Sequence, residues 1–261
     1  MDIEDLQARY RAGLEITREA GALALDYYRR RGSLPIEHKG RQDFVSVADK
    51  KTEDLIVERL AAAFGDDSVL GEAGGLRQKG PALWVIDPID GTANFLRGIP
   101  HWCVSVGLVV DGKAVAGFLH NPVTDELFSA HAGGGAFLNG EAIAVSGADE
   151  ITQSNLGMGY AHRLPLAPYI AEMNTSLAGG CDVRTLGSGA LDVGFVAAGR
   201  LDATFYRHIN LWDVAGGLAI ALEAGATASD FLGGEGMTKG NAILVSTPAL
   251  YAPLHAMFLE D

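Results

Sequence analysis

Apolar residues recur at helical spacing near the start of the chain. A stripe that runs from Ile3 to Tyr27 returns every three or four residues, and it predicts an amphipathic helix over 3–30. The same spacing predicts a second helix over 49–64, which Gly65 ends. The first sixty residues are therefore expected to supply a helix pair with one apolar side.

The pattern then changes to short apolar or alternating runs, which are typical of strands. Asp111-Gly112 separates two of these runs and is a hairpin signal. The predicted strands cover residues 69–72, 83–87, 102–110, 113–120 and 125–130. Because hairpins join neighbouring strands, we expect an antiparallel sheet in this part of the chain.

The remaining residues alternate between the two patterns. Strands are predicted at 155–160, 182–185, 201–206 and 242–246. Helices are predicted at 168–178, 188–199, 212–224 and 248–259. This order predicts an α+β fold of stacked layers. We expect one catalytic domain over 1–261, loosely divided into an antiparallel-sheet half, 1–145, and an α/β half, 146–261.

Composition and charge narrow the class of protein. Of the 261 residues, 48% are hydrophobic and the net charge is −13. An acidic balance argues against binding nucleic acid or a membrane surface, although metal ions would still allow a phosphate substrate. No uncharged apolar run approaches the roughly 20 residues of a membrane span. With no signal-peptide pattern and with Cys103 and Cys181 expected to be reduced, we expect a cytoplasmic protein.

The run from Trp84 to Phe95 carries the most distinctive chemistry. An apolar strand leads into Asp87 and Asp90, and no lysine or arginine lies within the run. Two carboxylates at a strand end are costly to bury unless a cation neutralises them, and Mg²⁺ prefers such oxygen ligands. The amides of Gly91 and Thr92 would open a helix and form a seat for phosphate. A plain turn capped by Asp87 would explain only one of the two acids.

Asp87-Pro88-Ile89-Asp90-Gly91-Thr92 resembles the signature of the inositol monophosphatase family. Three further segments are similar to family motifs and follow in the same order: Lys39 with Asp43–Asp49, Gly71-Glu72, and Trp212–Gly216. The resemblance covers nearly the whole chain. It implies a layered α-β-α-β-α sandwich of the sugar-phosphatase type with the site between the two halves. It also implies a Mg-dependent, lithium-sensitive phosphatase.

The resemblance implies a metal site with two or three Mg²⁺ ions. Glu72, Asp87 and the carbonyl of Ile89 would hold one ion, and Asp87, Asp90 and Asp213 would hold a second. A third, weaker ion would lie near Glu72. Without the other motifs, Glu72 could as well be an exposed acid in a loop as a metal ligand, and Asp213 could as well be a helix cap.

The catalytic residues implied by the resemblance are Asp49, Thr92 and Glu72. The Thr92–Asp49 pair would orient the attacking water and receive its proton. Such help is needed because phosphate monoesters hydrolyse extremely slowly without a catalyst. Asp49 could instead cap the helix over 49–64, and the two roles could coexist.

The substrate contacts implied by the resemblance are backbone groups and a few side chains. They are Asp90, Gly91, Thr92, Gly189, Tyr206, Arg207 and Lys39. Lys39 would act as a point charge for phosphate, or it is a solvated surface lysine.

Two positions depart from the family pattern. Ala73 stands where many members carry a second acid after the metal-binding glutamate. Tyr206 stands seven residues before Asp213, where inositol-phosphate hydrolases commonly carry a glutamate that binds a sugar hydroxyl. Losing this acid and gaining Arg207 and His208 puts the leaving group in doubt. His162, Arg163 and His208 are rim candidates, whereas His101-Trp102 is expected to be packing.

Myo-inositol 1-phosphate is the first expected substrate, and a small phosphorylated molecule the expected partner. Histidinol phosphate, fructose 1,6-bisphosphate and 3'-phosphoadenosine 5'-phosphate are alternatives. A cationic histidinol group would want an acidic rim, so the missing glutamate argues against this substrate unless Glu172 or Asp192 compensates for it. A regulatory scaffold is a further reading, since some family members associate with transcription machinery. The resemblance also implies a homodimer, for which apolar aromatic surface near 95–102 could serve.

Overall fold

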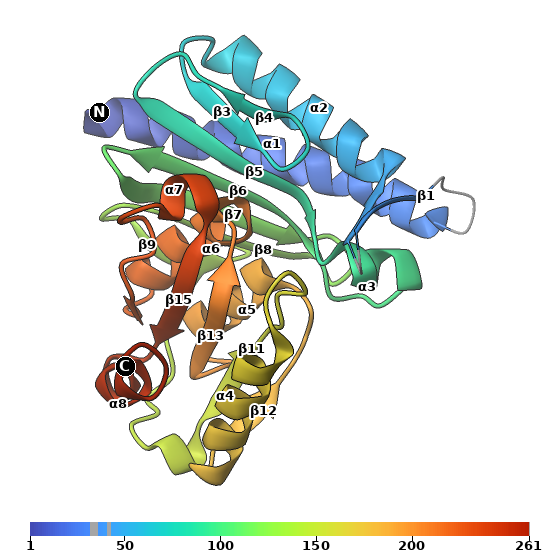
Figure 1. Cartoon of the computed structure of the whole chain (residues 1–261). Coiled ribbons are helices and arrows are strands. Elements are labelled where there is room, and N and C mark those ends of the chain that lie inside the picture. Colours follow the sequence, from blue (N-terminus) through green and yellow to red (C-terminus); the bar gives the residue numbers. More distant parts are fainter. Residues whose placement is uncertain (32–35, 41–42, 261) are drawn as a thin grey trace.

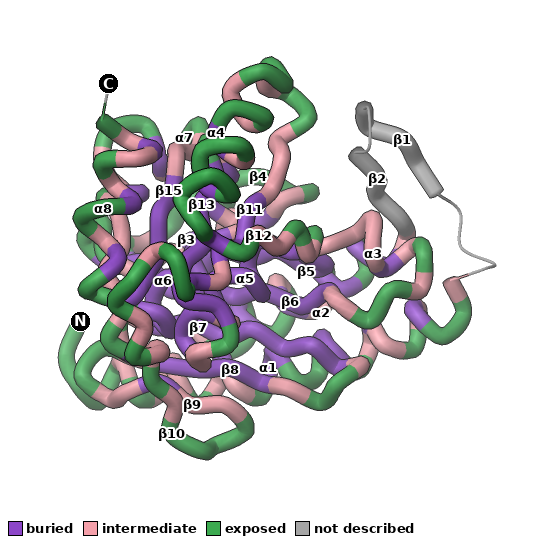
Figure 2. The backbone as a smooth tube through the Cα atoms, turned by 90° about the horizontal axis from the view of Figure 1, so that it is seen from below, coloured by how far each residue is buried: buried purple, intermediate pink, exposed green. Residues whose placement is uncertain are grey.

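The computed structural model describes the backbone of residues 1–31, 36–40 and 43–260, and the side chains of residues 1–31 and 47–260. Its elements form five layers in the order helix, sheet, helix, sheet, helix (Figure 1). The layered α-β-α-β-α sandwich expected from the sequence is therefore confirmed. Buried residues concentrate in the two sheets and in the helix layer between them (Figure 2).

The first layer consists of α1 (Ile3–Arg29) and α2 (Val47–Ala63), which cover one face of an eight-stranded sheet. The strand order of this sheet is β10-β9-β8-β7-β6-β5-β3-β4. Its strands are β3 (Ser68–Gly71), β4 (Gly75–Arg77), β5 (Ala82–Asp90), β6 (Cys103–Val110), β7 (Lys113–Asn121), β8 (Glu126–His131), β9 (Gly135–Leu138) and β10 (Glu141–Ile143). The predicted apolar stripes of both helices, including Ile16 and Ile56, pack against this face.

The middle layer consists of α5 (Gly189–Ala197) and α6 (Leu211–Glu223). It lies on the other face of the eight-stranded sheet, so every residue of β6 is buried. The α6 backbone approaches this sheet very closely, because a Cβ at Gly117 would lie less than 3.0 Å from the Gly216 carbonyl. The small residues in the middle of α6, among them Gly216, are thus required by the packing distance.

The second sheet has the order β12-β11-β13-β15-β14. Its strands are β11 (Asn155–Met158), β12 (Asp182–Arg184), β13 (Ala203–Ile209), β14 (Thr227–Ala228) and β15 (Asn241–Ser246). The outer layer is formed by α4 (Leu166–Ala178) and α8 (Pro248–Phe258). Phe205 stacks on Phe258 with ring centroids 4.3 Å apart, which fixes α8 against the sheet.

Short elements complete the fold. A two-stranded hairpin, β1 (Ile36–Gly40) and β2 (Asp43–Ser46), precedes α2. A short helix, α3 (Thr92–Arg97), follows β5, and another, α7 (Gly236–Lys239), precedes β15. A one-turn 3-10 helix, Ile151–Gln153, precedes β11.

Most predicted elements are present within one to three residues of their expected ends. The main correction concerns the predicted strand 83–87, since β5 continues to Asp90. Asp87 and Asp90 therefore lie inside a strand, and its pairing with β6 is irregular between them. The hairpin predicted at Asp111-Gly112 is confirmed, with φ of 50° and 70° at these two residues. The short strands β1, β2, β4, β9, β10 and β14 and the short helix α7 were not predicted.

Several expectations about surface and packing are also tested. Cys103 and Cys181 are both free and buried, as expected. Trp102 is fully buried, which confirms its packing role, but Phe95 is fully buried too. The prediction of an exposed aromatic surface near 95–102 is therefore wrong, and Ile99 is the large apolar residue exposed there. Among the described residues, no helix combines the length and apolar character that crossing a bilayer requires. The single domain over 1–261, loosely divided near residue 145, stays a prediction.

Candidate active site

Three acidic side chains meet where β5 ends and α6 begins. Asp87, Asp90 and Asp213 each offer a carboxylate oxygen, and these oxygens lie within 4.8 Å of one another. Asp87 and Asp90 come from the first sheet, and Asp213 comes from the first turn of α6. The structure thus brings together acids that are more than 120 positions apart in the sequence.

Asp87 lies at the centre of this acidic cluster. Its side chain is only 3% exposed, and its Oδ1 accepts a hydrogen bond from the amide of Ile89 at 2.9 Å. Burial raises its pKa well above the usual range, and the charges of Glu72, Asp90, Asp213 and Asp49 raise it further. Such a group is ionised in the folded protein only when a positive charge offsets its neighbours.

Asp90 is held by the N-terminus of α5. The Ser188 hydroxyl and the Ala190 amide both donate to its Oδ2, the latter at 2.8 Å, and the Gly189 amide also bonds to this carboxylate. Burial and the charge of Asp213 raise the pKa of Asp90 to about 7, and these three hydrogen bonds oppose the rise. The bonds from Ser188 and Ala190 both fall on Oδ2, so neither of them occupies Oδ1. The predicted substrate contact Gly189 is thus seen to bind Asp90 through its backbone.

Asp213 lies both in the acidic cluster and in the capping box of α6, whose N-cap residue is Asn210. It is the third residue of α6, and its Oδ2 accepts from the amide of Asn210 at 3.0 Å in a capping box. At the same time its carboxylate belongs to the cluster with Asp87 and Asp90. Burial raises its pKa, and the bonds from Asn210 oppose that rise. The cap therefore orients the carboxylate toward the other acids.

Glu72 reaches the cluster from the turn between β3 and β4. Its amide donates to the carbonyl of Ile86 at 3.2 Å, so its backbone is attached to β5 one residue before Asp87. Its side chain is half-buried, and its charge is the largest of those that raise the pKa of Asp87. The reading of Glu72 as an isolated surface acid does not fit this position.

Thr92 and Asp49 lie side by side, as expected. The Thr92 hydroxyl is 3.4 Å from Oδ1 of Asp49 and 2.9 Å from the carbonyl of Ile89. A hydroxyl has one hydrogen, so it donates to one of these acceptors at a time. Asp49 is 1% exposed in the first turn of α2. Asp49 is therefore sheltered from bulk water, whereas Thr92 is half-buried.

Gly91 connects β5 to α3 in a conformation that favours glycine. Its φ is 91°, and an added Cβ would lie 3.1 Å from the His101 carbonyl and 3.2 Å from the Gly187 carbonyl. Phosphate binding by the amides of Gly91 and Thr92 stays a prediction.

Tyr206 and Arg207 both contact protein partners. The Tyr206 hydroxyl donates to Oδ2 of Asp192 at 2.6 Å, and both side chains are buried. Burial raises the pKa of Asp192 to about 8. Arg207 forms an ion pair with the buried carboxylate of Glu172. Direct substrate contact by these two side chains stays a prediction.

Arg163 is a cation close to the acids. Its Nε donates to Nδ1 of His208 at 3.2 Å, and its guanidinium is 3.3 Å from Oδ1 of Asn210. Burial and the charge of Arg163 lower the pKa of His208, which keeps the ring neutral and able to accept this bond. The charge of Arg163 also lowers the pKa of Asp213. The predicted rim residues Arg163 and His208 are thus adjacent, whereas His162 packs on Tyr160.

The side chain of Lys39 lies outside the described residues, so its expected role stays a prediction. Three polar side chains to which the sequence reasoning gave no role support the site: Ser188, Asn94 and Glu53. Asn94 donates at 2.8 Å to the carbonyls of both His101 and Leu186, which joins α3 to the loop before α5. Glu53 accepts bonds from the turn that carries Glu72. Its position one helical turn after Asp49 was the available signal.

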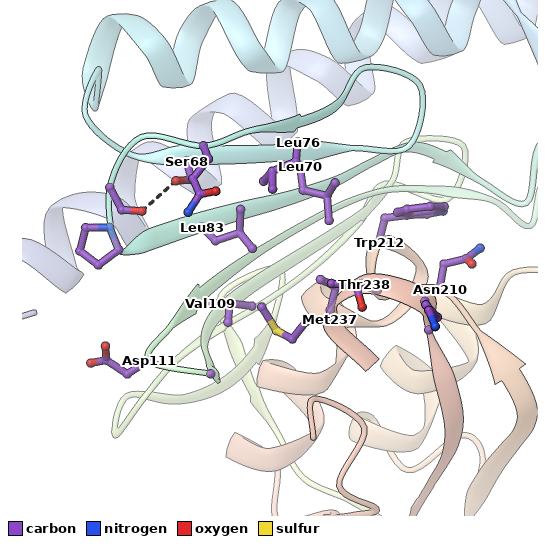
Figure 3. Close-up of a pocket in the computed structure, with 17 residues that line it drawn as sticks. Ser68, Leu70, Leu76, Leu83, Val109, Asp111, Asn210, Trp212, Met237 and Thr238 are labelled. Atoms are coloured by element: carbon purple, nitrogen blue, oxygen red, sulfur yellow. Dashed lines mark hydrogen bonds between the residues drawn. The ribbon is translucent and has the colours of Figure 1, made fainter. Parts of the chain in front are cut away.

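A cavity of about 520 Å³ borders the α6 end of the site. Leu70, Leu83 and Val109 line it from the first sheet, and Trp212 and Met237 line it from the other side (Figure 3). Its lining includes Trp212, the residue before Asp213, but none of the clustered acids. The acids therefore lie beside this apolar cavity and not in it.

Comparison with known proteins gives consistent matches over the whole chain. The model of the inositol monophosphatase family matches residues 5–260. A protein named "Nus factor SuhB" from Xylella fastidiosa is 38% identical over 224 residues, which are 85% of this chain and 82% of that protein. An "Inositol-1-monophosphatase" from Mesorhizobium japonicum is 35% identical over 95% of this chain and 92% of that protein.

Solved structures also match. The crystal structure of the extragenic suppressor protein suhB from Bartonella henselae superposes with a TM-score of 0.89 at 31% identity. The match covers 96% of this chain and 98% of that one.

Proposed function

The chain belongs to the inositol monophosphatase family, and we propose that it is a Mg²⁺-dependent phosphatase whose substrate is myo-inositol 1-phosphate. The observation that carries this proposal is the cluster of Asp87, Asp90 and Asp213, with Glu72 and Asp49 as charged neighbours. A site that only supported the fold would gain little from placing four acids around Asp87, because their charges raise its pKa.

The residues present fit Mg²⁺ chemically. Carboxylates and a backbone carbonyl are the oxygen ligands that this hard cation prefers, and divalent charge would offset the repulsion within the cluster. We assign Glu72, Asp87 and the Ile89 carbonyl to one ion, and Asp87, Asp90 and Asp213 to a second; a third near Glu72 belongs to the same proposal. When bound, Mg²⁺ supplies charge for the phosphoryl oxygens and a lowered pKa for water.

The chain's own groups would orient and deprotonate the attacking water. Asp49 accepts a proton, and Thr92 relays it through its hydroxyl, whose second acceptor is the Ile89 carbonyl. Glu72 would complete this catalytic group from the β3–β4 turn. Asp90 is oriented by three donors from α5, so its carboxylate is fixed before substrate binds. The Gly91 and Thr92 amides would receive the phosphate at the start of α3.

The identity of the alcohol is the open part of this proposal. Substrates with a second anionic group, namely 3'-phosphoadenosine 5'-phosphate and fructose 1,6-bisphosphate, are a second candidate because Arg163 is exposed beside Asn210 and near Asp213. The same cation disfavours histidinol phosphate, which carries a positive charge. Glu172 does not compensate for it, because it is paired with Arg207.

The test is inorganic phosphate release by the purified protein with Mg²⁺, with and without Li⁺. Inositol 1-phosphate, histidinol phosphate and the two bisphosphates are compared, and Asp87→Asn is the inactive control. Preference for inositol 1-phosphate with inhibition by Li⁺ supports the first candidate. Preference for a bisphosphate that Arg163→Ala abolishes supports the second. Phosphate release that persists in Asp87→Asn would contradict the assignment of the site.

We also propose a homodimer that works in the cytoplasm. The exposed apolar residues Leu166, Ile170 and Leu177 lie along one side of α4, each about half exposed, and Ile99 adds a fourth. Two unpaired, buried cysteines are consistent with a reducing compartment. Light scattering after gel filtration tests the dimer: Ile170→Asp is expected to give monomers, and a wild-type monomer would refute it. A purely regulatory role gains no support from an acidic chain with a complete carboxylate cluster.

A further inference from the structure

Glu53 is a buried acid that contacts the turn carrying Glu72. It lies in α2, and its side chain is 4% exposed. Its Oε2 accepts from the amide of Ala73 at 2.9 Å, and its Oε1 accepts from the amide of Gly74 at 2.7 Å. Both oxygens of one carboxylate are therefore bonded to the two residues that directly follow Glu72.

The backbone of this turn is shaped around the Glu53 carboxylate. A Cβ added to Gly71 or to Gly74 would lie closer than 3.0 Å to carboxylate atoms of Glu53. Real Cβ atoms essentially never approach that closely, so side chains at these positions would force the acid or the turn to move. Glycines make the turn flexible in isolation, and the two bonds from Glu53 remove that freedom.

The same helix carries Asp49 four residues earlier. Residues at i and i+4 lie on one face of a helix, so α2 presents both acids to the site. Asp49 reaches Thr92, while Glu53 reaches the β3–β4 turn. The position of Glu72 relative to Asp49 is consequently set through one rigid element.

We propose that Glu53 is a positioning residue for Mg²⁺: it holds the Glu72 turn in the geometry that lets Glu72 share an ion with Asp87. This inference rests on the proposed function, because it assumes that the acidic cluster binds Mg²⁺. Without Glu53, the glycine-rich turn would have to be ordered each time an ion binds, which weakens binding. Groups that orient metal ligands typically change metal affinity by about 10–100-fold.

The test is calorimetric titration of Mg²⁺ into the whole protein without substrate. For Glu53→Ala we expect the Mg²⁺ concentration at half-saturation to rise about 10-fold or more. Glu53→Gln keeps one carbonyl oxygen as an acceptor, so a smaller rise is expected. Gly74→Ala replaces none of the acidic residues, but its methyl group would displace the Glu53 carboxylate. It should therefore also raise the Mg²⁺ concentration at half-saturation.

Asp67→Asn is the matched control. Asp67 is also a buried acid that accepts several bonds, from the Arg9 guanidinium and from the Trp84 indole at 2.9 Å. It lies just before β3, whereas the Glu72 turn follows β3. We expect Asp67→Asn to lower the melting temperature and to leave Mg²⁺ half-saturation unchanged.

Two results would overturn the proposal. One is wild-type Mg²⁺ binding in Glu53→Ala, Glu53→Gln and Gly74→Ala, with only the melting temperature lowered. The other is a wild-type chain that binds no Mg²⁺ at millimolar concentration. If Glu53→Ala does not fold, the other two variants decide. A wild-type chain that binds Mg²⁺ but releases no phosphate refutes the phosphatase proposal alone, because the titration needs no turnover.

Discussion

Replacing Tyr206 by phenylalanine separates a structural role from a role in substrate recognition. The change removes one hydroxyl, whose bond to Oδ2 of Asp192 is 2.6 Å long. Oδ1 of Asp192 has no hydrogen-bond partner, so the variant would leave a fully buried carboxyl group without any. An unsatisfied buried polar group costs about 1–3 kcal/mol of the free energy of unfolding.

The expected change is measurable in a chain of this size. At roughly 2–4 °C per kcal/mol, Tyr206→Phe should lower the melting temperature by about 2–12 °C. Urea unfolding of Tyr206→Phe, Asp192→Ala and the double variant gives the coupling between the two side chains, which should be about 1 kcal/mol or more. Since the hydroxyl is already bonded to Asp192, the ratio of kcat/KM values for inositol 1-phosphate and the bisphosphates should change little.

The opposite result would refute this reasoning. If Tyr206→Phe leaves the free energy of unfolding unchanged but alters the ratio of kcat/KM values by about 10-fold, the hydroxyl binds the substrate rather than Asp192. Tyr206 would then replace the family's glutamate as a direct contact. Asp192→Asn helps to separate the cases, because it keeps the shape of the pair while changing only the acid.

Three further predictions concern charge and backbone. Burial raises the pKa values of Asp90 to about 7 and Asp192 to about 8, so the folded protein binds more protons than the unfolded chain between about pH 4 and pH 8. Without Mg²⁺ the free energy of unfolding, measured by urea unfolding, should therefore fall as the pH rises through this window. Saturating Mg²⁺ should remove the decrease that is due to Asp90, and Asp192→Asn should remove the decrease that is due to Asp192. A free energy of unfolding that does not change with pH in the metal-free wild type would contradict this. Asp87→Asn should reduce phosphate release by at least about 100-fold, equivalent to about 2.7 kcal/mol of transition-state stabilisation. Because the raised pKa keeps the Asp87 carboxyl group neutral when no cation is bound, the metal-free variant should melt close to the metal-free wild type, and a much higher melting temperature would show that Asp87 is charged there. Gly91→Ala should cost about 1–3 kcal/mol in calorimetric unfolding, because its φ of 91° and the two nearby carbonyls leave no room for a methyl group; an unchanged melting temperature would show that the β5–α3 connection adapts.

The long elements were predictable because they repeat one pattern several times. α1 and α2 each show several turns of an apolar stripe, and β6 is one unbroken buried run. β4 and β10 have three residues each, too few for a period to be recognised. The end of β5 was misplaced for a chemical reason, since Asp87 and Asp90 interrupt the apolar pattern inside a strand.

Some residues of the site could likewise be predicted from the sequence, and others could not. Acids that bind a metal stand in recognisable motifs, and Asp87, Asp90 and Asp213 do meet as expected. Their supports are single polar residues whose partners lie elsewhere in the chain, and for Glu53 the spacing of four residues from Asp49 was a weak local signal. The hydroxyl of Tyr206 shows the limit most clearly, because only the folded structure reveals that it bonds to Asp192.

The bonds from α5 to Asp90 bear on how such a chain can be inherited. Asp90 belongs to the first sheet, while Ser188 and Ala190, which hold it, follow the second sheet's first strands by sequence. Recombination near residue 145 between two relatives would pair an acid from one parent with donors from the other. A chimaera whose α5 began one residue early or late would misalign those donors with Asp90, even if both halves folded. An exchanged half is therefore expected to keep the site only where both parents begin α5 in the same register relative to Asp90.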